Sequence, residues 1–280
     1  MKLRLVYLFR EASNCLFYYN RFVESINWEE FNHHNVSLVI LYKGQGTISN
    51  KPFISSKLKG KDVEFDLIDV PDRGFDLGAY AYYLDGKNCF CMLLNSYAYF
   101  RDSSALSKIY RYMHEIENYH RLKSLVIVTS ISLSSHGVYP LKKSLSLNQI
   151  MRNLLYYRWN LSSIEGYPSF PNLHFRTNGF IIHSHVYSEY MQIFGCPKNK
   201  QDCHLIESGE NSLTNWLFQN NYNVVFFGSS SITDLKNIDK IRQNFRQDNQ
   251  NELMVGDNQV DAYQKSTWWK KKMLNLKSWN

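Results

Sequence analysis

Short runs of almost continuous apolar residues recur along the chain, and they constrain the fold more than any other feature. Such a run is typical of a β-strand covered on both faces, because that strand has no solvent-facing side that must stay polar. Segments with helical spacing separate the runs, and this alternation predicts an α/β fold with a mostly parallel central sheet flanked by helices. The expected strands are residues 1–10, 36–42, 63–70, 90–94 and 124–128, and the expected helices are residues 11–26, 76–84 and 107–117.

The second half of the chain is more mixed. Helices are expected at residues 146–159 and 212–220, and strands at residues 180–182 and 224–227. Residues 236–251 are polar and rich in Asn, Gln and Asp, which is typical of a surface segment or linker. The sequence contains no internal repeat and no obvious linker between independent domains. One continuous domain is therefore the simpler interpretation of its 280 residues.

The charge balance indicates an anionic partner. The chain carries 32 Lys and Arg against 25 Asp and Glu, a net charge of +7. Nucleic acid, an acidic membrane surface and a phosphate-bearing small molecule all meet this condition, and the only dense basic cluster, residues 270–272, does not choose among them. Aromatic residues make up 15% of the chain, which suits either an aromatic core or a surface that stacks on sugars or bases.

The number of cysteines and the hydropathy of the sequence indicate in which cellular compartment the protein is expected. Five cysteines, an odd number with no regular spacing, argue against a disulfide-stapled secreted fold and for a reducing compartment. The first ten residues are too short and too basic for a signal peptide, and no run of about 18 apolar residues occurs. We therefore expect a soluble, cytoplasmic protein with no transmembrane segment.

The candidate site follows from the expected sheet. In an open α/β sheet, ligands bind in the crevice at the carboxyl ends of the strands. Phe9 and Arg10 end the first expected strand, residues 72–78 follow the third, and residues 95–97 follow the fourth. These three segments converge if the sheet is wound as proposed.

Residues 72–80 carry the most information. Gly74 and Gly78 allow tight backbone turns or the close approach of a ligand. Arg73 has a planar fork suited to phosphate or a base edge, and Asp76 can accept from ribose hydroxyls or a base N–H. Ordinary structural roles explain the same residues equally well, with Asp76 as the N-cap of the next helix and Arg73 on the surface.

Four pieces of the sequence, in order, resemble the nucleotide-sugar glycosyltransferases of the GT-A type that assemble polysaccharides, above all those of rhamnan synthesis. The resemblance spans roughly residues 1–270. Length, Asn content and the basic tail are also similar to the capsid-glycan β-xylosyltransferases of large algal viruses, the chloroviruses. The pieces are residues 73–80 (RGFDLGAY, followed by a strand ending in LNS), 174–180 (HFRTNGF), 207–214 (ESGENSLT) and 256–263 (GDNQVDAY).

The resemblance implies a Rossmann-like GT-A domain at residues 1–235, with residues 236–280 packing on it or closing over it. It implies a UDP-sugar donor, first of all UDP-xylose, and an oligosaccharide or glycoprotein glycan as acceptor rather than nucleic acid. The expected cytoplasmic location would be the host cytoplasm if the source is viral. The residues expected to bind the donor are Phe9, Arg10, Arg73, Asp76, Gly78, Asn95, Ser96, Asp257, Asn258 and Lys265.

One departure from the resemblance concerns the metal. Many relatives end the fourth strand with Asp-x-Asp, which binds a divalent cation on the diphosphate. Here residues 95–97 read Asn-Ser-Tyr, without the charged oxygens that hard cations prefer. Mn²⁺ or Mg²⁺ stays a candidate cofactor, with Asn95, His183 and Asp257 as weak candidate ligands. The alternative is a metal-independent enzyme in which Arg and Lys neutralise the leaving diphosphate.

Sugar transfer passes through an oxocarbenium-like transition state, and an inverting enzyme needs a carboxylate base for the acceptor hydroxyl. Glu207 is the expected base and Glu210 the second catalytic candidate. Either glutamate could instead be a solvated loop charge, and Glu210 could support the start of the next helix. Residues 176–178 could equally form an ordinary polar turn. The residues expected to contact the sugar or the acceptor are Arg176, Thr177, Asn178 and Tyr97.

Three alternatives stay open. A retaining transferase on the same fold would differ in the anomeric configuration of its product. A nucleic-acid-binding accessory protein would bind with a steep salt dependence. A relative that binds glycans without turnover would be consistent with the missing acidic pair.

Overall fold

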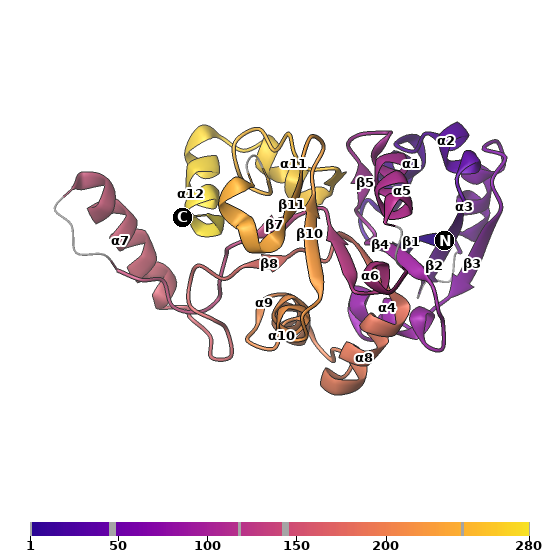
Figure 1. Cartoon of the computed structure of the whole chain (residues 1–280). Helices are drawn as coiled ribbons and strands as arrows, with labels where there is room; N and C mark the ends of the chain where they lie inside the picture. The colour runs from indigo at the N-terminus through magenta and orange to yellow at the C-terminus, as the bar shows by residue number, and fades with distance from the viewer. Residues whose placement is uncertain (1, 45–48, 117–118, 142–145, 242–243, 280) are drawn as a thin grey trace.

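The computed structural model describes residues 2–279 except 45–48, 117–118, 142–145 and 242–243. Its centre is an eight-stranded sheet in the spatial order β11-β10-β6-β9-β4-β1-β2-β3 (Figure 1). All strands of this sheet run parallel except β9 and β11, which confirms the expected α/β fold with a mostly parallel sheet. The strands are β1 (Leu3–Arg10), β2 (Val36–Lys43), β3 (Phe65–Asp69), β4 (Phe90–Leu94), β6 (Leu125–Val128), β9 (Gly179–His183), β10 (Asn223–Phe227) and β11 (Ile232–Asp234).

The direction of winding reverses between β1 and β4. The chain passes from β1 outward to β2 and β3, then crosses back so that β4 pairs with the other side of β1. In an open sheet, the crevice at such a switch point is where ligands bind. Arg10 at the end of β1 and Asn95 just after β4 flank it. The antiparallel strand β9 starts at the same edge, since Gly179 pairs with Leu94.

Helices cover both faces of the sheet, which explains why its strands are almost wholly apolar. In β1, Leu5 and Tyr7 pack on one layer, and Val6 and Leu8 pack on the other. None of the described helices is both long and apolar enough to cross a membrane. One layer contains α1 (Cys15–Glu24), α2 (Trp28–His33), α3 (Lys51–Leu58) and α5 (Ala105–Glu115), and the other contains α4 (Phe75–Leu84), α8 (Ser184–Phe194), α9 (Lys200–Ser208) and α10 (Leu213–Gln219). The remaining helices are α6 (Tyr119–Lys123), α7 (Leu147–Asn160), η1 (Leu235–Lys240), α11 (Asn258–Gln264) and α12 (Trp268–Ser278).

Two short antiparallel ladders continue from the carboxyl edge of the sheet. β5 (Tyr99–Phe100), which follows β4, pairs with β12 (Val255–Gly256). β7 (Ile131–Ser132), which follows β6, pairs with β8 (His174–Phe175). The ladders therefore bring segments that are far apart in the sequence to the edge where β1 and β4 end.

The polar stretch at residues 236–251 differs from its expected role as a surface segment. Asn244 and Phe245 are no more than 3% exposed. The Asn244 side-chain oxygen accepts from the Ile131 backbone N–H at 3.1 Å, and the Trp279 indole donates to the Phe245 carbonyl at 2.6 Å. The Asn244 side chain thus satisfies a buried backbone group, a use that composition cannot distinguish from solvation.

Helix α9 is absent from the expected elements, although the sequence carries its start signal. The Asn199 side chain accepts from the Asp202 backbone, and the Asp202 side chain accepts from the Asn199 backbone, which is a capping box. This helix includes Glu207, which the sequence interpretation places in a loop. At the other end of the chain, the expected helix at residues 11–26 begins only at Cys15, because Asn14 has a left-handed backbone with φ 63°.

The two ends of α12 offer a matched test of how the C-terminal segment is held. Trp279 is 6% exposed, whereas Trp268 is 62% exposed. Trp279→Ala should lower the free energy of unfolding by about 3–5 kcal/mol, because it opens a cavity under the segment. Trp268→Ala should change it by no more than about 0.5 kcal/mol. Urea unfolding followed by circular dichroism measures both, and equal effects would contradict this account of the packing.

Candidate functional site

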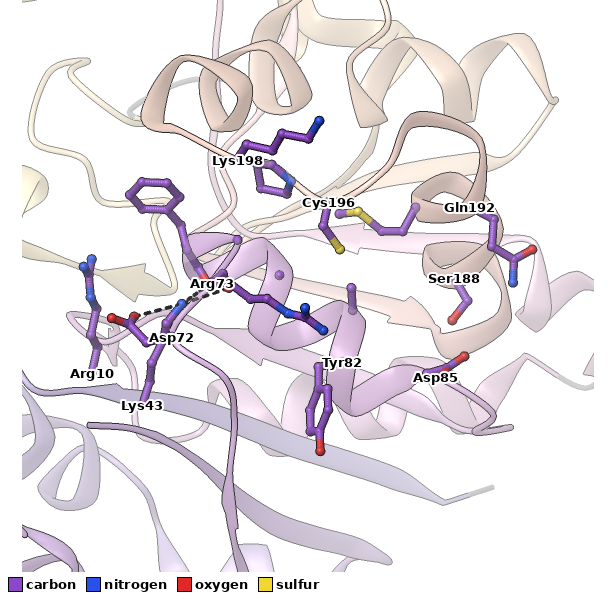
Figure 2. Close-up of a pocket in the computed structure, with 16 residues that line it drawn as sticks. Arg10, Lys43, Asp72, Arg73, Tyr82, Asp85, Ser188, Gln192, Cys196 and Lys198 are labelled. Atoms are coloured by element: carbon purple, nitrogen blue, oxygen red, sulfur yellow. Dashed lines mark hydrogen bonds and ion pairs between the residues drawn. The ribbon is translucent and has the colours of Figure 1, made fainter. Parts of the chain in front are cut away.

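A cavity of ≈ 870 Å³ opens at the carboxyl edge of the sheet, beside the N-terminus of α4. Arg10 and Lys43, the last residues of β1 and β2, are paired across the two strands and line it together. Figure 2 shows this pair with Asp72 at one end of the cavity, and Ser188 and Gln192 of α8 at the other. The cavity therefore lies between the strand ends, the loop after β3 and helix α8.

Positive charge predominates among the residues that line the cavity. Its basic residues number four and its carboxylates two, Asp72 and Asp85. The N-terminus of α4 adds the partial positive charge of a helix start. Its N-cap residue is Gly74, so no N-cap side chain accepts a hydrogen bond from the first N–H groups of the helix. Basic side chains at a helix N-terminus favour a phosphate-bearing ligand. The basic residues are Arg10, Lys43, Arg73 and Lys198.

Lys43 holds the loop after β3 in place. The residue is 2% exposed, and its ammonium donates to the carbonyls of Arg73 at 3.2 Å and Phe75 at 2.8 Å. Asp72 forms an ion pair with it at 3.5 Å. Burial lowers the pKa of Lys43, and the Asp72 carboxylate opposes this shift. Lys43 is thus a positioning residue for the turn that presents Arg73.

That turn has an unusual backbone. Gly74 and Phe75 both lie in the left-handed region, with φ 69° and 52°, which costs free energy at the non-glycine residue. Gly78 packs directly against the turn, because a Cβ added there would lie 2.8 Å from the Arg73 carbonyl oxygen. The two glycines therefore bring α4 close to its own preceding loop, as their spacing in the sequence allowed.

Asp76 is the electrostatic centre of this edge. Burial raises its pKa, the positive charges of Arg10 and Lys43 lower it, and the negative charge of Glu207 raises it further. Asp76 therefore feels the positive charge of two cavity residues as well as the negative charge of Glu207 in α9.

A second group of polar residues, here called the polar cluster, lies around the start of β9. The Arg176 guanidinium donates to the Asp257 carboxylate at 2.6 Å, and both side chains are almost fully buried. The Asn178 side-chain amide donates to the same oxygen at 3.1 Å, and the Asn178 backbone carbonyl accepts from the Asn95 backbone N–H at 3.4 Å. The cluster consists of Ser96, Ser130, Arg176, Asn178 and Asp257.

Several buried polar atoms of the cluster have no hydrogen-bond partner in the described part of the chain. These are the Ser96 and Ser130 hydroxyls, Nη1 of Arg176 and the side-chain oxygen of Asn178. An unpaired buried polar atom costs about 1–3 kcal/mol, so a ligand hydroxyl or a water that pairs with these atoms would be stabilised. The chemistry of the cluster suits a polyhydroxylated ligand.

Glu207 contacts the polar cluster through its neighbour Thr177. One carboxylate oxygen accepts from the Thr177 backbone N–H at 3.0 Å and lies 3.4 Å from its hydroxyl. The last turn of α9 and the turn before β9 thus hold each other. Neither Glu207 nor Asp76 lines the large cavity, and the negative charge of Glu207 raises the pKa of Asp76.

The structure distributes the other expected site residues unevenly. Arg10, Arg73 and Gly78 line the cavity. Phe9 does not reach it through its side chain, because that side chain is 1% exposed and packs on Tyr19 and Tyr42 in the core. The Tyr97 ring packs edge-on against Tyr18. Residues that lie on the surface away from the cavity lining are Asn258, Lys265, which ends α11, and Glu210, which lines a separate hollow of ≈ 600 Å³.

The three weak metal candidates do not form one site. The Asn95 side-chain oxygen accepts from the Tyr97 backbone. One Asp257 oxygen caps α11, and the other is bound by Arg176 and Asn178. His183 ends the antiparallel strand β9 and pairs with Phe90 at the opposite edge of the sheet. Within the described residues, no group of three or more His, Cys, Asp or Glu side chains could hold a metal ion.

Two cationic residues of the cavity are absent from the sequence-based set. Lys43 directly follows the apolar run of β2, where a charged residue is usually the solvated end of a strand. Lys43 could have been found from its position, because Arg10 and Lys43 are the last residues of two neighbouring parallel strands. Lys198 lies in the loop between α8 and α9, more than 100 residues further along the chain, and no sequence pattern predicts its contact with the cavity.

Comparison with known proteins adds distant structural likeness. No protein-family model matches this chain, and no curated protein matches it in sequence. TarS 1-349 of S. aureus aligns with 12% identity and a TM-score of 0.40, over 72% of this chain and 53% of that one. The mannosyltransferase PcManGT of Pyrobaculum calidifontis aligns with 7% identity and a TM-score of 0.42, over 80% and 53%. The inositol-1-phosphate CTP transferase of T. maritima aligns with 10% identity and a TM-score of 0.43, over 98% and 95%.

This chain therefore spans about half the length of the first two of these structures. Likeness at this level leaves the function to be argued from the residues of the site. The cavity and the polar cluster carry that argument.

The glycine pair of the turn can be tested with a matched control. Gly78→Ala should lower the free energy of unfolding by about 1–3 kcal/mol, because the added methyl meets the Arg73 carbonyl. Gly60→Ala places its methyl in open space and should shift stability by no more than about 0.5 kcal/mol. Thermal unfolding measures the difference, and a neutral Gly78→Ala would contradict the close packing of α4 on its loop.

The raised pKa of Asp76 predicts a pH-dependent cost. A carboxyl whose pKa is higher in the folded chain than in the unfolded chain destabilises the fold once it ionises, so the cost is present above the raised pKa. Asp76→Asn should therefore raise the melting temperature near neutral pH. The gain should fade as the pH falls toward about 4, the ordinary pKa of aspartate. Melting curves from acidic to neutral pH check this, and a gain that grows on acidification would contradict it.

Proposed function

We propose that this protein is a glycosyltransferase that moves a sugar from a nucleotide-diphosphate donor to a hydroxyl of a glycan acceptor. The observation that carries the proposal is the basic cavity at the carboxyl end of β1, where the winding of the sheet reverses. Its positive charge suits a diphosphate. The buried polar cluster lies at the same edge of the sheet but does not line the cavity, and we propose that its unpaired atoms meet the sugar.

Arg10, Arg73 and Lys198 are the proposed partners of the diphosphate, together with the N-terminus of α4. Asp76 is the proposed acceptor for the nucleoside hydroxyls. A carboxylate beside Arg10 and Lys43 keeps a hydrogen-bond acceptor within this positively charged edge. We propose a UDP-sugar as the donor, with UDP-xylose as the first choice, on the strength of the sequence resemblance.

Glu207 is the proposed catalytic base of an inverting reaction. Its carboxylate would take the proton of the acceptor hydroxyl while that oxygen bonds to the anomeric carbon of the sugar. The bond from the anomeric carbon to the diphosphate breaks, and the electron pair leaves with the diphosphate toward Arg10 and Arg73. The hydrogen bond from the Thr177 N–H to Glu207 supports the role, because it fixes one carboxylate oxygen in place. Arg176 and Asn178 would hold the sugar or the acceptor.

No step is assigned to a metal ion. The residues after β4 do not suit a hard divalent cation, because Asn95 supplies an amide oxygen that is already hydrogen-bonded. The proposal instead gives the basic side chains of the cavity the role of neutralising the leaving diphosphate. Assays with and without Mn²⁺ compare the two arrangements directly.

A thermal-shift screen tests donor binding. UDP, GDP, CDP and dTDP are compared, each with and without Mn²⁺, and one nucleoside diphosphate should raise the melting temperature above the others. A ligand at about 100 times its Kd stabilises the folded state by about 2.7 kcal/mol, which this method resolves. Arg73→Ala should reduce the shift. No shift with any nucleotide would contradict the proposal.

The role of Glu207 is tested by substitution with a residue of the same shape. Glu207→Gln keeps an oxygen for the Thr177 N–H but has no basic carboxylate, so transfer should fall about 100-fold or more while nucleotide binding and melting temperature stay close to the parent. The exposed Glu165→Gln is the control. Full activity of Glu207→Gln would remove the residue from the mechanism, and the anomeric configuration of the product separates inversion from retention.

A further inference from the structure

Helix α7 stands apart from the rest of the molecule (Figure 1). Among its contacts with the body is an aromatic cluster, in which its buried Tyr156 and half-buried Trp159 pack on Tyr139 and Phe170. Asn160 also exchanges hydrogen bonds with the Tyr139 backbone. In Figure 1 the helix runs outward from this cluster at the end of the molecule opposite β2 and β3. The face of α7 that carries Tyr156 and Trp159 is therefore the one that packs on the body.

The opposite face of α7 carries an apolar stripe. Residues 150, 154, 157 and 161 have the spacing that brings side chains to one side of a helix. They are large apolar or aromatic residues, and each is strongly exposed. The stripe is Ile150 at 41% exposure, Leu154 at 60%, Tyr157 at 59% and Leu161 at 73%, with Met151 at 62% on its flank.

The charged residues of α7 itself are all basic. Between Glu117 and Glu165 the sequence contains no acidic residue, whereas α7 itself carries Arg152 and Arg158. On the helical wheel, Arg158 falls between Leu154 and Met151, at the edge of the stripe. An apolar stripe bordered by arginine and tyrosine suits the interface of an anionic bilayer, where apolar side chains enter the lipid and basic ones meet phosphate groups.

Helix α12 adds a second feature of the same kind at the same end of the molecule (Figure 1). Trp268 and Trp269 are 62% and 68% exposed, and the Lys272 ammonium lies 5.2 Å from the centroid of the Trp268 ring. No acidic residue follows Asp261 in the sequence. Exposed tryptophan beside lysine is characteristic of side chains that anchor proteins at a membrane surface.

We propose that this end of the molecule, the stripe on α7 and the exposed start of α12, binds the surface of an anionic membrane without crossing it. A second copy of the chain suits the surface less well, because it would bring two faces of the same positive sign together. A lipid surface supplies both the apolar layer and the opposite charge. The proposal goes beyond the proposed catalytic function and does not depend on it.

Sedimentation with vesicles tests the proposal without any enzymatic readout. One vesicle preparation contains phosphatidylcholine only, and in the other roughly a third of the lipid is phosphatidylserine. We expect about tenfold or greater partitioning onto the anionic vesicles. Raising the ionic strength from about 0.1 M to about 1 M should release much of the bound protein, because the screening length falls from about 10 Å to about 3 Å.

Matched variants locate the surface. Leu154→Glu combined with Leu161→Glu should reduce binding to anionic vesicles about tenfold or more, and Trp268→Ser with Trp269→Ser should reduce it independently. The control is Ile193→Glu, which changes an equally exposed apolar residue of α8 outside this surface. Melting temperatures of all variants verify that the fold is retained.

Two results would overturn the proposal. One is equal, weak sedimentation with both vesicle preparations. The other is a molar mass, measured by light scattering, that corresponds to a dimer in the parent and to a monomer in the Leu154→Glu, Leu161→Glu variant, which would assign the stripe to a second copy of the chain. Loss of nucleotide binding in the thermal-shift screen would leave this vesicle result unaffected.

Discussion

The crossing of the chain from β3 back to β4 is the constraint on which the site depends. Because β4 joins the free side of β1, the loops that follow these two strands diverge and leave a crevice between them. Arg10 and Lys43 come from the ends of β1 and β2, Arg73 from the loop after β3, and Lys198 from the loop between α8 and α9. The polar cluster lies on the β4 and β9 side. A sheet wound in one direction only would place these two groups at separate points along its edge.

Several features at the carboxyl edge of the sheet lower the stability of the folded chain. Phe75 has a left-handed backbone, Lys43 is buried, and several atoms of the polar cluster lack partners. Each feature costs stability, and apolar packing on both faces of the sheet offsets the sum. Unpaired buried polar atoms also occur elsewhere, for example at Arg4 and His183, so the polar cluster is distinguished by its place at the carboxyl edge of the sheet rather than by its cost alone.

The sequence predicts the sheet better than the site, because strands follow from local patterns whereas the site depends on contacts between residues far apart in the sequence. Apolar runs and strand-end positions are local, and the residues selected from them include Arg10, Arg73 and Gly78, which line one cavity. Lys43 and Lys198 were not predicted, since their roles depend on which strands and loops become neighbours. The pair Arg176 and Asp257 lies 81 residues apart, and only the short ladders beyond the sheet bring its members together. Phe9 and Arg10 face opposite sides because they are adjacent in a strand, and the Phe9 side chain lies in the core.

The buried ion pair between Arg176 and Asp257 also has a consequence for the order of folding. The strands β1 to β4 can associate while the ribosome is still making the second half of the chain, but the guanidinium of Arg176 waits for a carboxylate that is synthesised much later. Until then, the start of β9 holds an uncompensated buried cation or stays open. The polar cluster therefore cannot be completed before residue 257 leaves the ribosome, whereas the pairing of β1 with β2 and β4 does not require that residue.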